Sequence, residues 1–343
     1  MHPPSWWQNE DGSLLPKYLG PLGSVYGQIV KARFTYTKPY DCKLPIICVG
    51  NFTLGGTGKT PIAIKVAHIL QSQGWYPSFL SKGYKGKSRG PLLVDPAEHS
   101  ANDVGDEPLL LADHAPTVIA KNRVEGAWLL EQRRTDLIIM DDGFQNPTLD
   151  KTLNLIAIDS KTKLGNERIF PAGPLRAPLA FQLAKADALI ITGSEPLDLL
   201  EELQTKYKFE KPILTGHVSP NEDTEWLKDK PILAYAGIAR PEKLFDSLSQ
   251  AGGKVIRRIP FPDHYTFTSK DAAHLTKLAL KDDLQLVTTQ KDLVRINEEE
   301  HHQLRALKRM SHAFPVEFTF NEQDEKKLIE LIKEKVPKPD QDA

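Results

Sequence analysis

The segment that most restricts the fold is the glycine-rich stretch CVGNFTLGGTGKTPIAI, Cys48 to Ile64. It follows an apolar run typical of a buried strand and enters a segment with helical periodicity, in which Ile62, Val66, Ile69 and Leu70 share one face. A glycine-rich turn between a strand and a helix brings backbone N–H groups to a helix N-terminus, where they can bind phosphate. The stretch therefore predicts a phosphate-binding loop at the edge of an α/β sheet.

Short apolar runs alternate with helical patterns along most of the 343 residues. The runs LPIICVGN, PTVIAKN, TDLIIMDD, LNLIAIDS and ADALIIT are typical of buried parallel strands, and a second series starts at PILAYAG. We predict an α/β fold in which a P-loop domain with a doubly wound, mostly parallel sheet is followed by a second, smaller α/β domain. The predicted boundaries are an amphipathic N-terminal segment at 1–43, the P-loop domain at 44–228, the smaller domain at 229–336 and a disordered tail at 337–343.

Composition excludes several classes of protein. Two cysteines, Cys42 and Cys48, cannot form a disulfide framework or a four-thiolate zinc site, which fits a reducing compartment. No apolar run approaches the roughly 18 residues of a membrane span, and the N-terminus lacks the layout of a signal peptide. The formal net charge of −1 gives no overall field that would attract nucleic acid, so we expect no nucleic-acid partner. We expect a cytoplasmic protein that can still lie on a membrane face.

The residues GGTGKT supply the parts of a nucleoside-triphosphate site. The glycines allow close backbone approach to phosphate, Lys59 can reach the β- and γ-phosphates, and the Thr60 hydroxyl can ligate Mg²⁺. A glycine-rich turn with an incidental lysine is the alternative. Thr53 stands where the usual pattern GxxxxGK(S/T) has glycine, which points away from the commonest loop families. The predicted nucleotide contacts are Thr53, Gly55, Gly56, Thr57, Gly58, Lys59, Thr60 and Pro61.

A carboxylate for the metal is expected at the end of a neighbouring strand. The run TDLIIMDDGFQN ends in Asp141 and Asp142 and continues into a glycine turn and Gln145. Taken alone, paired aspartates after a strand are as often helix caps or solvated turn residues. Beside a P-loop, a magnesium role is favoured, with Thr60 and one of the two aspartates as ligands. Spacing does not decide which aspartate touches the metal.

Six motifs resemble, in order, those of the tetraacyldisaccharide 4′-kinases of lipid A synthesis. They are Val49 to Asn51, Gly55 to Pro61, Gly105 to Pro108, Asp141 to Gln145, Pro171 to Arg176 and Asp263 to Tyr265. The resemblance implies that the γ-phosphate of ATP is transferred to the 4′-hydroxyl of a lipid-linked glucosamine disaccharide 1-phosphate. Two positions depart from the family pattern, because Ala177 stands where a glutamate is frequent and Lys82 where an arginine is common.

The resemblance also singles out a base for the sugar hydroxyl. Asp106 would accept the hydroxyl proton, and His264 would hydrogen-bond to Asp106 and hold it in place. Lys59 and Asp142 are the other predicted catalytic residues. The alternatives are a helix N-cap for Asp106 and a packed loop histidine for His264. The basic loop SKGYKGKSRG and two further arginines are candidates for anionic groups of the substrate. The predicted substrate contacts are Lys82, Arg89, Arg123, Gln145 and Arg176.

The N-terminal segment fits an acylated substrate. Residues 14–43 hold five Lys or Arg against one Asp, and Leu22, Val25, Tyr26, Ile29 and Val30 share one helical face. Such stripes usually pack against a core, which is the alternative. Given the implied lipid substrate, we expect peripheral binding to the cytoplasmic face of the bacterial inner membrane.

Two other classes of protein carry similar loops. A P-loop ATPase switch of the partitioning or metal-insertion type usually has an extra lysine before the paired glycines, where this chain has Leu54. A non-catalytic nucleotide-binding module is the third possibility. ATP consumption that depends on the disaccharide lipid would select the kinase over both.

Overall fold

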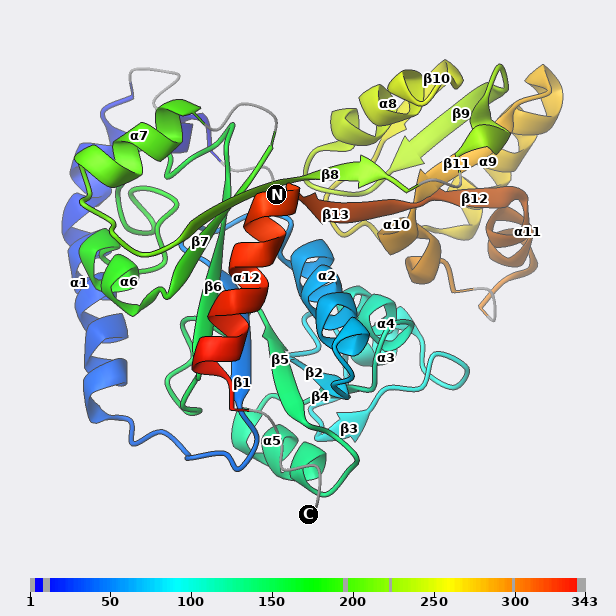
Figure 1. Ribbon diagram of the computed structural model, residues 1–343. Helices are drawn as coiled ribbons and strands as arrows, with labels where there is room; N and C mark the ends of the chain where they lie inside the picture. Colours follow the sequence, from blue (N-terminus) through cyan, green and yellow to red (C-terminus); the bar gives the residue numbers. More distant parts are fainter. Residues whose placement is uncertain (1–3, 9–12, 194–196, 222–223, 298–299, 338–343) are drawn as a thin grey trace.

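Two α/β domains make up the computed structural model, which describes residues 4–8, 13–193, 197–221, 224–297 and 300–337 (Figure 1). The predicted fold class is confirmed: one large, mostly parallel sheet is accompanied by a second, smaller sheet. All but the first residue of the predicted disordered tail, 337–343, lies outside the described residues.

Nine strands form the large sheet. In spatial order they are β13 (Val316–Phe320), β8 (Ile213–Pro220), β7 (Ala188–Thr192), β6 (Leu153–Asp159), β1 (Ile46–Asn51), β5 (Leu137–Asp141), β2 (Pro77–Ser81), β4 (Thr117–Ile119) and β3 (Leu92–Leu93). Every pairing is parallel except β3 with β4 and β8 with β13. β1 lies in the middle and is buried along its whole length, so its near-continuous apolar run has both faces covered.

Alternate residues of β1 face two different hydrophobic cores. Ile47 and Val49 lie in the core beneath α2 (Lys59–Ser72), whereas Ile46 and Cys48 lie in the core on the other face of the sheet. The remaining helices of this domain are α1 (Leu15–Tyr36), α3 (Ala101–Val104), α4 (Asp106–Ala112), α5 (Arg123–Glu131), α6 (Leu179–Lys185), α7 (Leu197–Thr205) and α12 (Glu322–Lys335), with a short 3₁₀ helix at Ser5–Gln8. A second 3₁₀ helix, Glu225–Leu227, packs Leu227 into a core of the small domain.

The small domain is built around a four-stranded parallel sheet. Its strands, in spatial order, are β10 (Lys254–Pro260), β9 (Pro231–Ala236), β11 (Gln285–Thr289) and β12 (Ser311–Phe314). Its helices are α8 (Pro241–Gln250), α9 (Ser269–Asp282), α10 (Gln290–Arg295) and α11 (His302–Met310). Hydrophobic cores lie on both faces of this sheet. α8 begins at Pro241, because the fixed φ of proline suits the first turn of a helix.

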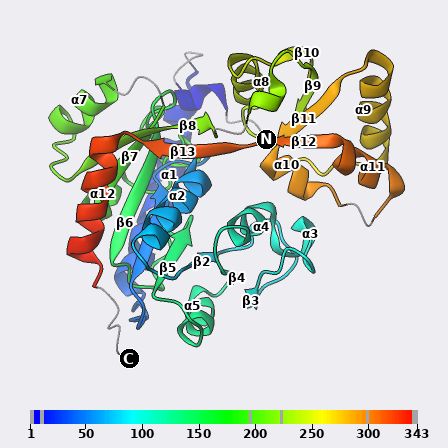
Figure 2. The same cartoon turned by 45° about the vertical axis from the view of Figure 1, so that its right-hand side comes forward.

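The chain returns to the large domain after β12, which differs from the predicted extent of the small domain, 229–336. β13 pairs antiparallel with β8, and the two strands run side by side between the domains (Figures 1 and 2). α12 follows, and its Leu328 and Ile332 join the core beneath α2. The run PVEFTF has the character of a strand in either domain, and only the pairing with β8 decides between them.

Helix α1 packs through its small residues and exposes its large apolar ones. Gly23 and Gly27 are buried against the segment around Ile169, where an added Cβ would come within 2.7 and 2.8 Å of Ile169 atoms. Leu22 and Ile29, by contrast, are 58% and 55% exposed. Of the predicted apolar stripe only Val30 is buried, so most of this stripe does not pack on the core. Within the described residues, no helix is long and apolar enough to cross a membrane.

Candidate active site

The phosphate-binding loop lies between β1 and α2, at the carboxyl edge of the large sheet. Gly58, with φ of 78°, precedes the first residue of α2, and Gly55 has φ of 120°. Such backbone angles favour glycine. A Cβ added at Gly55 or Gly56 would meet no atom within 4 Å, so the loop backbone is open to a ligand. The side-chain amide of Asn51 donates to the carbonyl of Gly55, 3.4 Å away, and ties the loop to the end of β1.

Asp142 is surrounded by two cations. Arg176 donates from Nη1 to Asp142 Oδ1 at 2.7 Å, and Lys59 Nζ lies 3.8 Å from the same oxygen. Burial alone would raise the pKa of Asp142, but Lys59 and Arg176 outweigh it and lower the pKa to about 2. Arg176 also donates from Nε to the carbonyl of Thr53 and from Nη1 to Gln145, at 3.0 and 3.2 Å. Arg176 therefore joins the P-loop to the end of β5.

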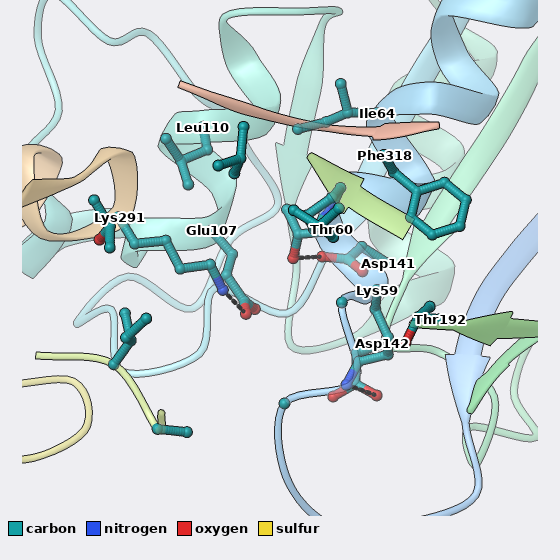
Figure 3. Close-up of a pocket in the computed structure, with 18 of the residues that line it drawn as sticks. Lys59, Thr60, Ile64, Glu107, Leu110, Asp141, Asp142, Thr192, Lys291 and Phe318 are labelled. Atoms are coloured by element: carbon teal, nitrogen blue, oxygen red, sulfur yellow. Dashed lines mark hydrogen bonds and ion pairs between the residues drawn. The ribbon is translucent and has the colours of Figure 1, made fainter. Parts of the chain in front are cut away.

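Asp141 and Thr60 offer ligands of the kind that Mg²⁺ prefers. The Thr60 hydroxyl donates to Asp141 Oδ2 at 3.2 Å, and Asp141 Oδ1 is buried with no hydrogen-bond partner among the described residues (Figure 3). Burial and the nearby Glu107 carboxylate raise the pKa of Asp141 to about 7, and Lys59 opposes them. A buried carboxylate oxygen without a partner fits a hard cation. The described residues contain no cluster of three or more His, Cys, Asp or Glu that could enclose a metal, so phosphate oxygens would have to complete its coordination.

The opposite wall of the site holds Asp106. It is the first residue of α4, after Gly105, and it is 5% exposed. Arg295 of α10 donates to Asp106 Oδ2 from Nε at 2.7 Å and also from Nη2. His264 Nδ1 lies 3.2 Å from the same oxygen. Burial would raise the pKa of Asp106, but the hydrogen bond from His264 and the charge of Arg295 hold it well below its usual range.

Next to this group, Glu107 forms an ion pair with Lys291. Lys291 Nζ lies 2.8 Å from Glu107 Oε1, and Figure 3 shows the pair beside Thr60 and Asp141. The charge of Lys291 lowers the pKa of Glu107 despite its burial. Arg295 and Lys291 both belong to the small domain, whereas Asp106 and Glu107 belong to the large one. The two ion pairs therefore join the domains across the site.

A cavity of about 1750 Å³ separates the two walls. Most of the predicted loop residues line it, together with Asp141, Asp142 and His264, but Asp106 is not among the lining residues. Of the predicted substrate contacts, Lys82, Arg123, Gln145 and Arg176 line the cavity, and Arg89 is an exposed residue outside this lining. Arg123 is 3% exposed, and burial lowers its pKa to about 10, which leaves it charged at neutral pH.

Three residues of the site were missed by reasoning from sequence: Glu107, Lys291 and Arg295. Glu107 stands in the GDEP motif, where only its neighbour was chosen. Lys291 stands in TTQKD, a motif that suggests base recognition in GTPases. The structure instead buries Asp292 within the small domain, where it accepts from Gly237 N and Thr289 Oγ1. The available signal was the spacing of Lys291 and Arg295, which share a helix face at i and i+4.

A family model for tetraacyldisaccharide-1-P 4′-kinase matches residues 15–337. The chain belongs to the tetraacyldisaccharide-1-phosphate 4′-kinase family. A tetraacyldisaccharide 4′-kinase of Rhodopseudomonas palustris (strain BisB5) is 43% identical over 86% of this chain and 87% of its own length. One of a Bradyrhizobium strain is 43% identical over 94% of this chain and 90% of its own length.

The fold of the family is also known from a crystal. The structure of LpxK from Aquifex aeolicus, in an "apo" form in complex with ATP, matches with a TM-score of 0.74. Its sequence is 28% identical, and the match covers 94% of this chain and 100% of that one. The family and the enzyme class predicted from the sequence are therefore confirmed, and a kinase of this family is favoured over the ATPase switch.

Proposed function

We propose that this chain transfers the γ-phosphoryl group of ATP to the 4′-hydroxyl of a tetraacyldisaccharide 1-phosphate. The observation that carries the proposal is the pairing of two walls around one cavity: an open P-loop backed by Thr60 and Asp141, and a buried Asp106 held by His264. A phosphoryl transfer needs both a phosphate cradle and a group that orients the nucleophile.

The P-loop residues bind the phosphates in this proposal. The open backbone of Gly55 and Gly56 faces the β-phosphate, and Lys59 stabilises charge on the γ-phosphoryl oxygens. Lys59 is 3.8 Å from Asp142 in the structure, so it turns from this carboxylate toward the nucleotide. Arg176 remains on Asp142 and keeps that carboxylate charged and in place.

Mg²⁺ fits beside Thr60 and Asp141. The unpartnered Asp141 Oδ1 and the Thr60 hydroxyl would hold it, directly or through water, with Asp142 next to them. The ion would supply charge stabilisation to the transferring phosphoryl group. The raised pKa of Asp141 supports this placement, because a bound cation favours the charged form of a carboxylate that burial disfavours.

Asp106 orients the sugar hydroxyl. Its pKa is well below the usual range, so it is charged at neutral pH and acts as an acceptor for the hydroxyl proton, chiefly by position. His264 donates to it when Nδ1 carries the hydrogen, and the 3.2 Å separation allows this. Arg295 is bonded to Asp106 in the structure. The sugar hydroxyl therefore reaches Asp106 only after α10, which carries Arg295, moves away from α4.

The substrate's anionic end lies at the basic residues of the cavity in this proposal. Lys82, Arg123 and Arg176 line it and are candidates for phosphate or sugar contacts, with Gln145. Ala177 is fully buried, so this position offers no polar group to metal or substrate. Arg89 is the weakest of the predicted contacts, because it lies outside the cavity lining.

Helix α1 places the enzyme on a lipid surface, we infer, at the cytoplasmic face of the inner membrane. The exposed Leu22, Val25 and Ile29 form an apolar face with no cover among the described residues, and the segment carries an excess of basic residues. Phe170, 38% exposed, extends this surface next to Tyr26, with ring centroids 5.7 Å apart. An acylated substrate then reaches the cavity without leaving the bilayer entirely.

Transfer of γ-³²P from ATP to a tetraacyldisaccharide 1-phosphate tests the reaction. We expect labelled lipid with Mg²⁺ and none with Lys59→Ala, whereas phosphate release without lipid would favour the ATPase switch. For the membrane surface, Leu22→Asp with Ile29→Asp should abolish co-sedimentation with anionic vesicles. Unchanged membrane recovery and lipid turnover after deletion of the residues before Leu44 would overturn the role of α1.

A further inference from the structure

The end of β11 and helix α10, which share the motif TTQKD, fix two cations at the edge of the small domain. Asp292 is fully buried and accepts from Gly237 N, Thr289 Oγ1 and Arg295, at 3.1, 2.7 and 2.8 Å. These bonds anchor the start of α10 within the small domain. Lys291 and Arg295, one helical turn apart, are then directed across the boundary to Glu107 and Asp106.

The two cations differ in what holds them. The Arg295 side chain is 7% exposed and has three acceptors in reach: Asp106, Asp292 and the Gly237 carbonyl. Lys291 is 29% exposed on its side chain and pairs with Glu107, at 2.8 Å. Arg295 is therefore a fixed structural cation, whereas Lys291 has a flexible stem and can change partners.

Lys291 lies within the same cavity as the P-loop. Lys59, Thr60 and Lys291 all line it, and Figure 3 shows Lys291 extending to Glu107 beside the Thr60–Asp141 pair. The Glu107 carboxylate raises the pKa of Asp141 and the Lys291 ammonium lowers it, so Lys291 compensates part of the repulsion between the two carboxylates. A triphosphate on the loop brings more negative charge into this space than a single carboxylate, and it attracts the same ammonium group.

We propose that Lys291 leaves Glu107 for the terminal phosphate of a bound nucleoside triphosphate, so that the small domain supplies a second lysine to the phosphate site. The inference rests on the proposed kinase function. It makes the position of the small domain depend on the γ-phosphate, because ADP lacks the group that would compete with Glu107 for Lys291. The enzyme then distinguishes ATP from ADP through a residue outside the P-loop.

Nucleotide binding without lipid acceptor tests this directly. The affinities for Mg²⁺–ADP and for a non-hydrolysable methylene analogue of Mg²⁺–ATP are measured by calorimetry. We expect Lys291→Met to weaken the analogue about tenfold and ADP by less than about twofold, as for one charge-assisted hydrogen bond. Lys291→Arg should restore most of the preference. Equal losses for both nucleotides, or none for either, overturn the proposal.

Two further variants separate phosphate contact from mere neutralisation of Glu107. The double variant Lys291→Met with Glu107→Gln removes both charges and keeps the net charge of the pair. We expect it to lose the preference for the analogue, and a wild-type preference would show that Lys291 acts only by neutralising Glu107. Glu107→Gln alone should keep or raise analogue affinity, since Lys291 no longer has a competing carboxylate, and a tenfold loss would overturn the exchange.

Lys254→Met is the matched control. Lys254 is also a small-domain lysine in an ion pair, 3.1 Å from Asp229, but it is exposed and does not line the cavity. The Lys254→Met variant should bind both nucleotides with the affinities of the unchanged chain. If the unchanged chain binds neither nucleotide, the proposed function fails. If it binds both and Lys291→Met does not alter its preference, only the inference about Lys291 fails.

Discussion

The two walls of the cavity are built in different ways. The P-loop wall comes from segments that a parallel sheet brings to one edge: the end of β1, the start of α2 and the end of β5. The opposite wall joins α4 of the large domain to α10 of the small one, through residues 189 positions apart in the case of Asp106 and Arg295. The first wall is a property of the sheet, and the second exists only while the domains are docked.

The largest effect is expected at the wall that the sheet builds. Lys59→Ala should lower kcat by about 10³–10⁵-fold, because a cation at the transferring phosphoryl group acts mainly in the transition state. Nucleotide affinity should fall much less. Single-turnover transfer and calorimetric binding measure the two quantities. Full turnover in this variant would remove Lys59 from the mechanism.

The second-largest effect is expected at the wall that joins the two domains. Asp106→Ala and His264→Ala should each lower kcat by about 10²–10⁴-fold with little change in the KM for ATP. The two side chains act as a unit, so the double variant should be little worse than the poorer single one. Steady-state kinetics on all three variants decide the matter. Multiplicative losses would show that His264 acts independently of Asp106.

A third domain contact tests whether docking depends on the active-site pairs alone. Asp159, at the end of β6, is buried and accepts from Arg240 of the small domain and from Lys243 at 3.1 Å. Because both cations are partly exposed, Asp159→Asn should cost only about 1–3 kcal/mol in the free energy of unfolding. It should also speed hydrogen exchange at the boundary.

Asp246→Asn is the control for this contact, since Asp246 is an exposed acid on α8 whose nearest ion-pair distance is 3.7 Å. Urea titrations of both variants give the comparison. An equal loss of unfolding free energy in Asp159→Asn and Asp246→Asn would show that Asp159 does not hold the domains together. Burial opposes the low pKa of Asp159, and Arg240 and Lys243 outweigh it. Its contribution is therefore present above pH about 4 and lost as the pH falls below that value.

The smallest effect is expected where the two walls touch. His68 of α2 and His114, just after α4, have ring nitrogens 3.0 Å apart. Burial lowers the pKa of both histidines. The charge of Lys65 lowers the pKa of His68 further, and the neighbouring His68 lowers that of His114 further. The unfolded chain therefore binds more protons below pH about 6.5, and stability should fall as the pH drops through that value.

His68→Gln should flatten this fall between pH 7 and 5 by less than about 1 kcal/mol, since the exposed position is screened by solvent. Melting temperatures of the variant and the unchanged chain across this range measure it. His99→Gln serves as a control, because His99 lies in a turn whose contacts are local. A parallel pH profile in His68→Gln would show that the pair does not titrate with folding.

The contrast between the walls also explains what could be predicted from the sequence. The βαβ order, the P-loop and the aspartates after β5 are local patterns, and each was predicted. Asp106 and His264 came from the resemblance, and the structure places them 3.2 Å apart, although their roles remain predictions. Lys291 and Arg295 were missed because their partners lie in another domain. The periodicity of one segment does not predict which residues of two domains come into contact. The placement of β13 was missed for the same reason.

The return of the chain through β13 has a consequence for synthesis. Phe318 and Phe320 of β13 and Leu328 of α12 belong to the core beneath the P-loop helix, yet they leave the ribosome only after the whole small domain has been made. The small domain has its own cores and can fold as soon as it emerges, while the apolar underside of α2 must wait. The nascent nucleotide-binding half therefore stays exposed to chaperones and proteases until its last helix arrives.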